Sequence, residues 1–193
     1  RQGSLVPVND PVELWKVRFK NTSETTREFK SFAFTEWVVG DQFNEDNYRN
    51  IMALYNRGYY DKELHSVIVH KEPTSTRTVT GYGFFTSDVS PEKFDCRKLS
   101  FLGQYRSWNN PIAIEEGSCK NSTVNGEDMV GVLQHILSLQ PSEEKEILFS
   151  LGYSEEESTV KELIRKYHVK DIGIRSLDEV KAFWRERIEG LTI

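Results

Sequence analysis

Up to about Tyr153, the chain is a succession of short segments with the two-residue periodicity of β-strands. In residues 12–20, Trp15, Val17 and Phe19 alternate with lysine and arginine, so one face of such a strand is apolar and the other charged. Similar segments follow at residues 29–37, 66–72, 78–87, 129–139 and 145–153. Many short strands separated by turns are typical of a sandwich or barrel. We therefore expect a mainly β fold, specifically an antiparallel β-sandwich.

The periodicity changes to 3.6 residues after Ser154. One apolar stripe at helical spacing consists of Val160, Leu163, Ile164 and Tyr167, and a second consists of Leu177, Val180, Phe183, Trp184 and Ile188. Each stripe is associated with the serine–glutamate spacing of a capping box, at Ser154–Glu157 and Ser176–Glu179. The sequence thus predicts a β-domain over residues 1–153 and two helices within residues 154–193. The apolar faces of these helices must pack on the sandwich or on another domain.

Composition excludes several classes of function. A chain of 193 residues with 37% hydrophobic and 28% charged residues can bury a core without disulfides. Its formal net charge of −5 argues against a nucleic-acid or anionic-membrane partner, and no apolar run approaches the roughly 20 residues that cross a bilayer. Cys96 and Cys119 fit neither a zinc site nor a CxxC motif. We expect free thiols, a cytoplasmic location and no bound metal.

The sequence contains no catalytic motif that we recognise. It has no GxSxG, HExxH, phosphate-binding GxxxxGK or glycine-rich dinucleotide loop. The four histidines are widely separated, and we interpret each as a surface or structural imidazole. Asp41, Glu45 and Asp46 could supply an acid–base pair, but their spacing does not require it. The residues alone therefore favour a binding or structural module over a catalytic one.

Two stretches are richer in polar and aromatic residues than turns need to be. The first follows the strand that ends near Trp37 and contains Asp41, Gln42, Asn44, Asn47, Arg49 and Asn50. The second, residues 101–122, contains Tyr105 and Trp108 among arginine, glutamine and asparagine. Aromatic faces with amide and guanidinium groups are the mixture that a sugar site uses. An alternative for Tyr105 and Trp108 is that they only pack their loop onto the sandwich.

Three motifs, in order along the chain, carry a resemblance to a known family. They are Glu36–Trp37 at the end of a strand pair, the FLGQY segment of residues 101–105, and the PSEEKE turn of residues 141–146. Together they resemble the N-terminal β-sandwich of the inverting glycoside phosphorylases of glycoside hydrolase family 94, which are cellobiose phosphorylase-like. The resemblance extends from about Val12 to the two helices, where Trp184 matches a recurrent tryptophan of the family linker.

The resemblance implies a fold and a reaction. The fold is a galactose-mutarotase-like supersandwich, of which residues 1–153 would be the C-terminal portion, followed by a helical linker to an (α/α)6 catalytic barrel outside this chain. The reaction is phosphorolysis of a β-linked gluco-disaccharide or oligosaccharide to a sugar 1-phosphate. It needs no cofactor besides inorganic phosphate as co-substrate. The chain itself would hold no catalytic residue, and the family implies a homodimer.

The resemblance also assigns a role to the polar stretch after Trp37. In the family, the corresponding loop helps to build the acceptor-sugar subsite. This implies that Arg49, Asn47, Asp41 and Gln42 bind substrate, with Tyr105 and Trp108 as candidates for stacking on a sugar. Two alternatives remain open: the phosphorylase-like domain of a cyclic β-1,2-glucan synthase, and a stand-alone carbohydrate-binding sandwich.

Overall fold

The computed structural model describes residues 2–40, 42–73, 81–169 and 171–190. The strands are β1 Gln2–Leu5, β2 Val12–Lys20, β3 Arg27–Glu36, β4 Asn56–Asp61, β5 Ser66–Lys71, β6 Tyr82–Ser87, β7 Lys93–Arg97, β8 Val124–Asn125, β9 Met129–Leu139 and β10 Glu144–Ser154. The helices are α1 Gln42–Met52, the 3-10 helix η1 Ala53–Tyr55, α2 Lys98–Leu102, α3 Ile112–Glu115, α4 Glu157–Tyr167 and α5 Ile172–Glu189.

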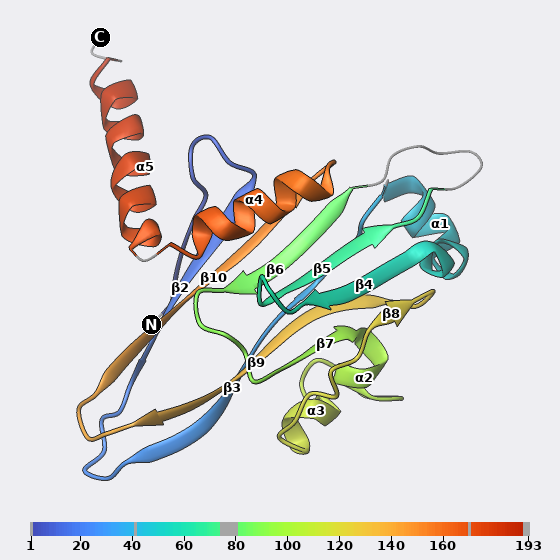
Figure 1. The fold of residues 1–193 in the computed structure, drawn as a ribbon, viewed down its shortest axis with the longest axis horizontal. Helices are drawn as coiled ribbons and strands as arrows, with labels where there is room; N and C mark the ends of the chain where they lie inside the picture. The colour runs from blue at the N-terminus through green and yellow to red at the C-terminus, as the bar shows by residue number, and fades with distance from the viewer. Residues whose placement is uncertain (1, 41, 74–80, 170, 191–193) are drawn as a thin grey trace.

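These strands form two antiparallel sheets, as the sequence predicted. The larger has the order β1-β2-β10-β6-β5-β4-β8, and the smaller has the order β3-β9-β7. In Figure 1 the helix α4 lies across one face of the larger sheet, while α2 and α3 lie beside the smaller sheet. The arrangement is therefore layered, with α4, the larger sheet, the smaller sheet, and α2 with α3 in succession.

Three hydrophobic clusters occupy the spaces between these layers. Between the sheets, Val67, Val69, Phe85 and Phe149 from the larger sheet meet Leu133 and Leu137 from β9. Behind the larger sheet, Leu14, Ile68, Phe84 and Leu148 pack with Val160, Ile164 and Tyr167 of α4. Outside the smaller sheet, Val130 and Val132 pack with Phe101, Ala113 and Cys119. Adjacent residues of a strand point to opposite faces, so the central strands supply two clusters at once.

Strand β2, which lies between β1 and β10 in the larger sheet, shows the alternation read from residues 12–20. Trp15, Val17 and Phe19 pack against the cluster between the sheets. On the opposite face Lys16 and Arg18 pair with Glu146, and Lys20 pairs with Glu144. The register of β2 on β10, with Arg18 opposite Glu146, places these charges across from each other.

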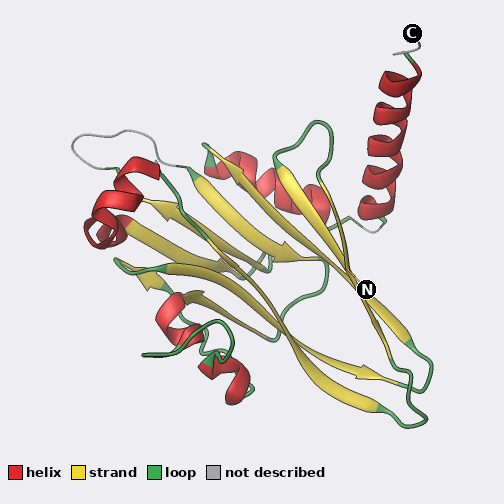
Figure 2. Cartoon of the chain, turned by 180° about the vertical axis from the view of Figure 1, so that it is seen from behind, coloured by secondary structure: helices red, strands yellow, loops and turns green. Residues whose placement is uncertain are grey.

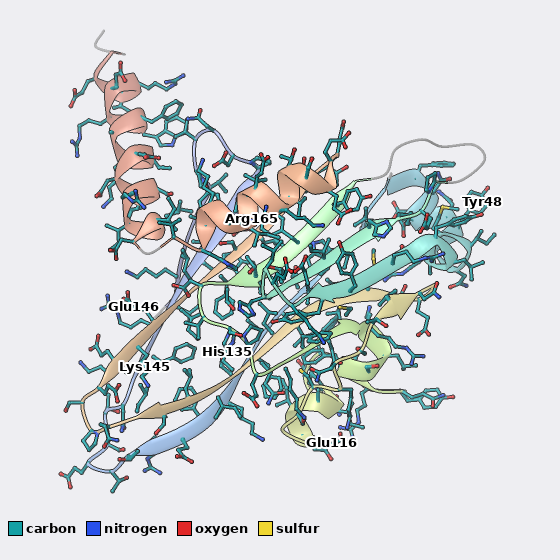
Figure 3. The ribbon with its side chains drawn as sticks, viewed as in Figure 1. Tyr48, Glu116, His135, Lys145, Glu146 and Arg165 are labelled. Atoms are coloured by element: carbon teal, nitrogen blue, oxygen red, sulfur yellow. The ribbon has the colours of Figure 1, made fainter. Side chains whose placement is uncertain are left out.

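The polar stretch after Trp37 is a helix and not the loop that we expected. Residues 42–52 form α1, and the backbone departs from helical geometry at Tyr48, where φ is −135° and ψ is 27°. Figure 3 shows Tyr48 at the outer end of the molecule. Gly40 lies between β3 and α1 and has a φ of +127°. This is a backbone conformation that L side chains rarely adopt. Sequence reasoning missed α1 because its apolar residues are few and stay at the surface.

Both predicted helices exist, but neither capping box forms. Ser154 is the last residue of β10, and Glu156 is the residue before α4. Helix α5 begins at Ile172, four residues before Ser176, which is buried inside the helix. Ile172 packs against the cluster under α4. That contact favours an earlier start, since tertiary packing outweighs a cap worth about 1 kcal/mol.

Trp37 links the two sheets, and its environment makes a stability prediction. A Cβ added at Gly131 would lie 2.3 Å from Trp37 Cη2, and one added at Gly83 would lie 3.0 Å from Trp37 Nε1. The ring is therefore held between two glycines. We expect Gly131→Ala to lower the free energy of unfolding by about 1–3 kcal/mol, measured by urea denaturation. Gly3→Ala is the control, because its Cβ would meet nothing within 4 Å. Equal stability of the two variants would contradict this packing.

Candidate functional site

One end of the sandwich brings together the ends of several strands. The register pairs Glu36 with Val130 and Arg97 with Met129, so β3 and β7 both end beside the start of β9. Asp128 immediately precedes β9, and Lys98 immediately follows β7. The chain also enters α1 from this end of β3, as Figure 1 shows. Charged residues that are far apart in sequence thereby face one region, which we call the α1 end.

Arg49 is the centre of the charges at the α1 end. Its Nη2 atom lies 3.1 Å from Glu36 Oε1 and 3.4 Å from Asp128 Oδ2. Partial burial opposes the charge of Arg49, but the carboxylates of Asp128 and Glu36 raise its pKa above the ordinary value. The side chain remains 47% exposed. Arg49 is thus held in place by two carboxylates while still presenting part of its guanidinium to solvent.

The other predicted sugar-binding residues of this segment have different surroundings. Asn47 is exposed on α1, and its Nδ2 atom donates a hydrogen bond of 2.7 Å to the Phe43 carbonyl one turn earlier. Gln42 is the first residue of α1, but its side chain lies outside the described part of the structure. Asp41 lies entirely outside the described residues. Arg49 and Asn47 are therefore the two whose side chains can be placed.

Glu36 connects the Arg49 side chain to the second predicted stretch. Lys98 Nζ donates a hydrogen bond to the same Glu36 Oε1 atom that Arg49 contacts. The same ammonium lies 5.3 Å from the centre of the Trp108 ring, a distance typical of a cation–π contact. The chain of contacts Arg49–Glu36–Lys98–Trp108 therefore brings the two sequence stretches together, although they are about 60 residues apart.

Trp108 and Tyr105 differ sharply in environment. The Trp108 ring is stacked on Phe34, with 5.1 Å between ring centres and 2° between the planes, and the residue is 37% exposed. Tyr105 is 97% exposed and has a left-handed backbone with φ 60°. Trp108 therefore packs its loop onto β3, which was the alternative to a sugar-stacking role. Tyr105 presents both ring faces to solvent.

A groove lies next to the Arg49 contacts. It has a volume of about 400 Å³ and is lined by Asn50, Ala53, Lys98, Leu99, Leu102, Gly103, Glu127 and Asp128. Its lining thus mixes amide and charged groups with aliphatic side chains. A groove of this size and chemistry suits a small polar ligand with apolar patches, such as a sugar ring.

The remaining candidates for chemistry have structural contacts. Burial lowers the pKa of His70, His135 and His168, and their rings contact Tyr82, Ser87 and Thr86 respectively. Cys96 and Cys119 are free thiols, as predicted, and burial raises the pKa of both. Glu45, one of the carboxylates considered for acid–base chemistry, forms an ion pair with Lys71. Among the described residues, no three His, Cys, Asp or Glu side chains are grouped to hold a metal ion.

Three residues of the α1 end escaped the sequence analysis. Lys98, Asp128 and Lys71 stand outside any motif, and each contacts a residue more than 25 positions away. Strand pairing within each sheet and the packing of one sheet on the other bring them to the site. A weak signal existed for Lys98 alone, because it shortly precedes the FLGQY segment.

Comparison with known proteins identifies the fold. The family model for the glycosyl hydrolase 94 supersandwich domain matches residues 2–170. The chain belongs to this family. The resemblance read from Glu36–Trp37 and the two later motifs is thereby confirmed. The match includes α4, which packs on the larger sheet, and it ends before α5.

Curated relatives of the supersandwich domain include two phosphorylases. The chain is 30% identical to the N,N'-diacetylchitobiose phosphorylase of Vibrio proteolyticus over 188 residues, which is 97% of this chain and 23% of the relative. It is 32% identical to the solabiose phosphorylase of Paenibacillus borealis over 166 residues, or 85% of this chain and 21% of the relative. The chain thus spans less than a quarter of the length of these relatives.

A third relative is named as a synthase and not as a phosphorylase. The cyclic β-(1,2)-glucan synthase NdvB of Rhizobium meliloti is 24% identical over 175 residues, or 90% of this chain and 6% of the relative. The supersandwich domain therefore matches small parts of proteins with three different named activities, two of them phosphorylases and one a synthase. A separate feature concerns membranes: no helix within the described ranges is long and apolar enough to span a bilayer.

The contrast between Trp108 and Tyr105 gives a prediction about the supersandwich domain. We expect Trp108→Ala to lower the free energy of unfolding by about 1–3 kcal/mol, because it removes the stack on Phe34. Tyr105→Ala should change it by no more than about 0.5 kcal/mol, since the ring is almost fully exposed. Chemical denaturation of both variants measures the difference. Equal losses would show that Tyr105 also packs on the domain.

Proposed function

We propose that this domain is the non-catalytic N-terminal part of an inverting β-glucoside phosphorylase. The observation that carries the proposal is the similarity of 97% of the chain to less than a quarter of a named phosphorylase. A second phosphorylase aligned over 85% of the chain supports it. The substrate would be a β-linked gluco-disaccharide or oligosaccharide, and the product a sugar 1-phosphate. The acceptor sugar is the sugar that the cleavage releases without a phosphate group.

The chemistry itself would come from residues outside this chain. In the proposed reaction a carboxylic acid protonates the glycosidic oxygen while inorganic phosphate attacks the anomeric carbon from the opposite face. Of the carboxylates that line the groove, Glu127 is paired with Arg97 and Asp128 with Arg49, and the sequence contains no phosphate-binding GxxxxGK loop. Phosphate is the only co-substrate that the proposal needs. The role left to this domain is to bind and orient the acceptor sugar.

Arg49 is the residue best placed for that role. A guanidinium carries five N–H donors, and its contacts with Glu36 and Asp128 both involve Nη2. The exposed remainder can donate hydrogen bonds to sugar hydroxyls. Asn47 and the fully exposed Tyr105 stay candidates for further sugar contacts, and so do Asp41 and Gln42. Trp108 is a weaker candidate because Phe34 covers one face of its ring.

The exposed apolar side chains of helix α5 support the proposal that this helix belongs to a linker. Only Ser176 of its described residues is buried, whereas Ile174, Leu177, Trp184 and Ile188 are exposed. Figures 1 and 2 show α5 projecting away from the two sheets. An amphipathic helix obtains most of its stability from packing its apolar face. We propose that α5 packs this face on the catalytic part of the enzyme. The predicted homodimer and cytoplasmic location remain predictions.

Replacing Arg49 tests the acceptor subsite. In the complete enzyme, we expect Arg49→Ala to lower kcat/KM for the acceptor by roughly tenfold or more, about 1.4 kcal/mol, measured in the synthetic direction with saturating sugar 1-phosphate. Arg27→Ala is the matched control, since Arg27 lies at the opposite end of β3. It should leave the kinetics unchanged. An unaltered acceptor constant for Arg49→Ala would exclude a role in this subsite.

The similarity to NdvB makes the glucan-synthase domain a second candidate. The reaction that the complete protein catalyses distinguishes the phosphorylase domain from the glucan-synthase domain. We expect the complete protein to release a sugar 1-phosphate from a β-linked gluco-disaccharide only when inorganic phosphate is present. Chromatography of the products measures this release. A cyclic glucan formed without phosphate would instead favour the synthase.

A further inference from the structure

Helix α1 carries the proposed sugar-binding residues but has little hydrophobic anchorage. None of residues 43–52 is buried, and Phe43, Tyr48 and Ile51 are well exposed. Among the described residues that precede the helix, the last one buried is Val39, which packs in the cluster between the sheets. Burial of Val39 therefore anchors the chain just before α1, whereas burial of apolar side chains contributes little along the helix itself. Polar contacts must determine where the helix lies.

A nearly buried ion pair is the first of these contacts. Lys71, the last residue of β5, is only 6% exposed, and its Nζ atom donates a hydrogen bond to the Glu45 carboxylate. The Glu45 side chain is 13% exposed. Lysine is almost never so buried without a partner. The pair ties the first turns of α1 directly to a central strand of the larger sheet.

The second set of contacts lies beyond the kink. Tyr48 interrupts the helical backbone between Glu45 and Arg49. Arg49 then contacts Glu36 and Asp128. The side of the kink before Tyr48 is thus held by Lys71 and the side after it by the two carboxylates, of which Asp128 also attracts the Lys71 ammonium.

These two sets of contacts differ in strength for a physical reason. Exposed ion pairs contribute little, because water screens them and both side chains lose freedom. Breaking a buried pair leaves one charge without a partner in a poorly solvated site, which is far more costly. Displacement of α1 from Lys71 would therefore be resisted more strongly than displacement from Glu36 or Asp128.

We propose that Lys71 and Glu45 are positioning residues for the acceptor-sugar subsite. Their ion pair holds α1 so that Arg49 reaches Glu36 and also Asp128, which lines the groove. This inference rests on the proposed function. Neither residue contacts the sugar; the pair sets the fraction of molecules in which α1 is correctly placed. A lower fraction weakens apparent acceptor affinity in proportion and leaves turnover at saturation unchanged.

The test uses Lys71→Met and Glu45→Gln in the complete enzyme. We expect the acceptor KM to rise about tenfold in Lys71→Met, with kcat and the KM for sugar 1-phosphate unchanged. Glu45→Gln should raise the same constant less, because the amide oxygen that replaces the carboxylate can still accept a hydrogen bond from Lys71 Nζ. The double variant Lys71→Glu with Glu45→Lys should recover part of the loss. Lys120→Met is the control, since it breaks only the exposed pair with Glu116.

Hydrogen exchange gives a readout that does not depend on activity. Amide exchange of residues 43–52 should rise in Lys71→Met and Glu45→Gln, while that of β5 and β9 stays unchanged. Unchanged exchange in α1 would overturn the inference. Loss of protection throughout the domain in both variants would also overturn it, because the pair would then support the whole fold.

The combined results separate this inference from the proposed function. If Arg49→Ala weakens acceptor binding but Lys71→Met affects neither exchange nor KM, the positioning role fails and the subsite stands. If exchange in α1 rises but neither variant alters acceptor kinetics, the pair holds the helix and the acceptor subsite lies elsewhere. In that case the positioning role in the subsite is excluded as well.

Discussion

Burial of the central strands on both faces is the constraint on which the rest of this structure depends. In β5, β6 and β10, neighbouring residues such as Val67 and Ile68, or Phe84 and Phe85, belong to different hydrophobic clusters. A strand with two covered faces has no surface left for function. Each fully buried side chain of this size contributes about 1.5–3 kcal/mol, so the clusters fix the order of the layers. Polar residues are consequently displaced to strand ends and to the helices beyond them.

The α1 end follows from this arrangement. Glu36, Lys71, Lys98 and Asp128 all lie at or next to the ends of strands. Their positions are set by rigid sheets, while α1 rests on them through ion pairs. A site built in this way combines a fixed base with a helix that has few buried contacts. Sites of that kind suit ligand binding, where groups must be presented to solvent but held in place.

Membership of the glycosyl hydrolase 94 supersandwich family is consistent with this separation between buried strands and polar strand ends. The described residues form a layered support with a polar end, at which Glu36, Asp128 and Glu45 are paired with basic side chains. Helix α4 is integrated into the fold through Val160, Ile164 and Tyr167, whereas α5 leaves most of its apolar face exposed. The two trailing helices therefore differ in kind, although their sequence patterns look alike. The family match ends between them, at residue 170.

The sequence by itself determined the β-sandwich, the existence of two C-terminal helices, the alternation of residues 12–20 and the family. These features depend on local periodicity and on motifs that survive in the linear chain. Only the tertiary structure decided that residues 42–52 are helical, that α5 begins before Ser176, and that Trp108 packs on Phe34. It also decided that Arg49, Glu36 and Lys98 meet. Such contacts join residues tens of positions apart, and they arise from strand register and burial, which no local pattern encodes.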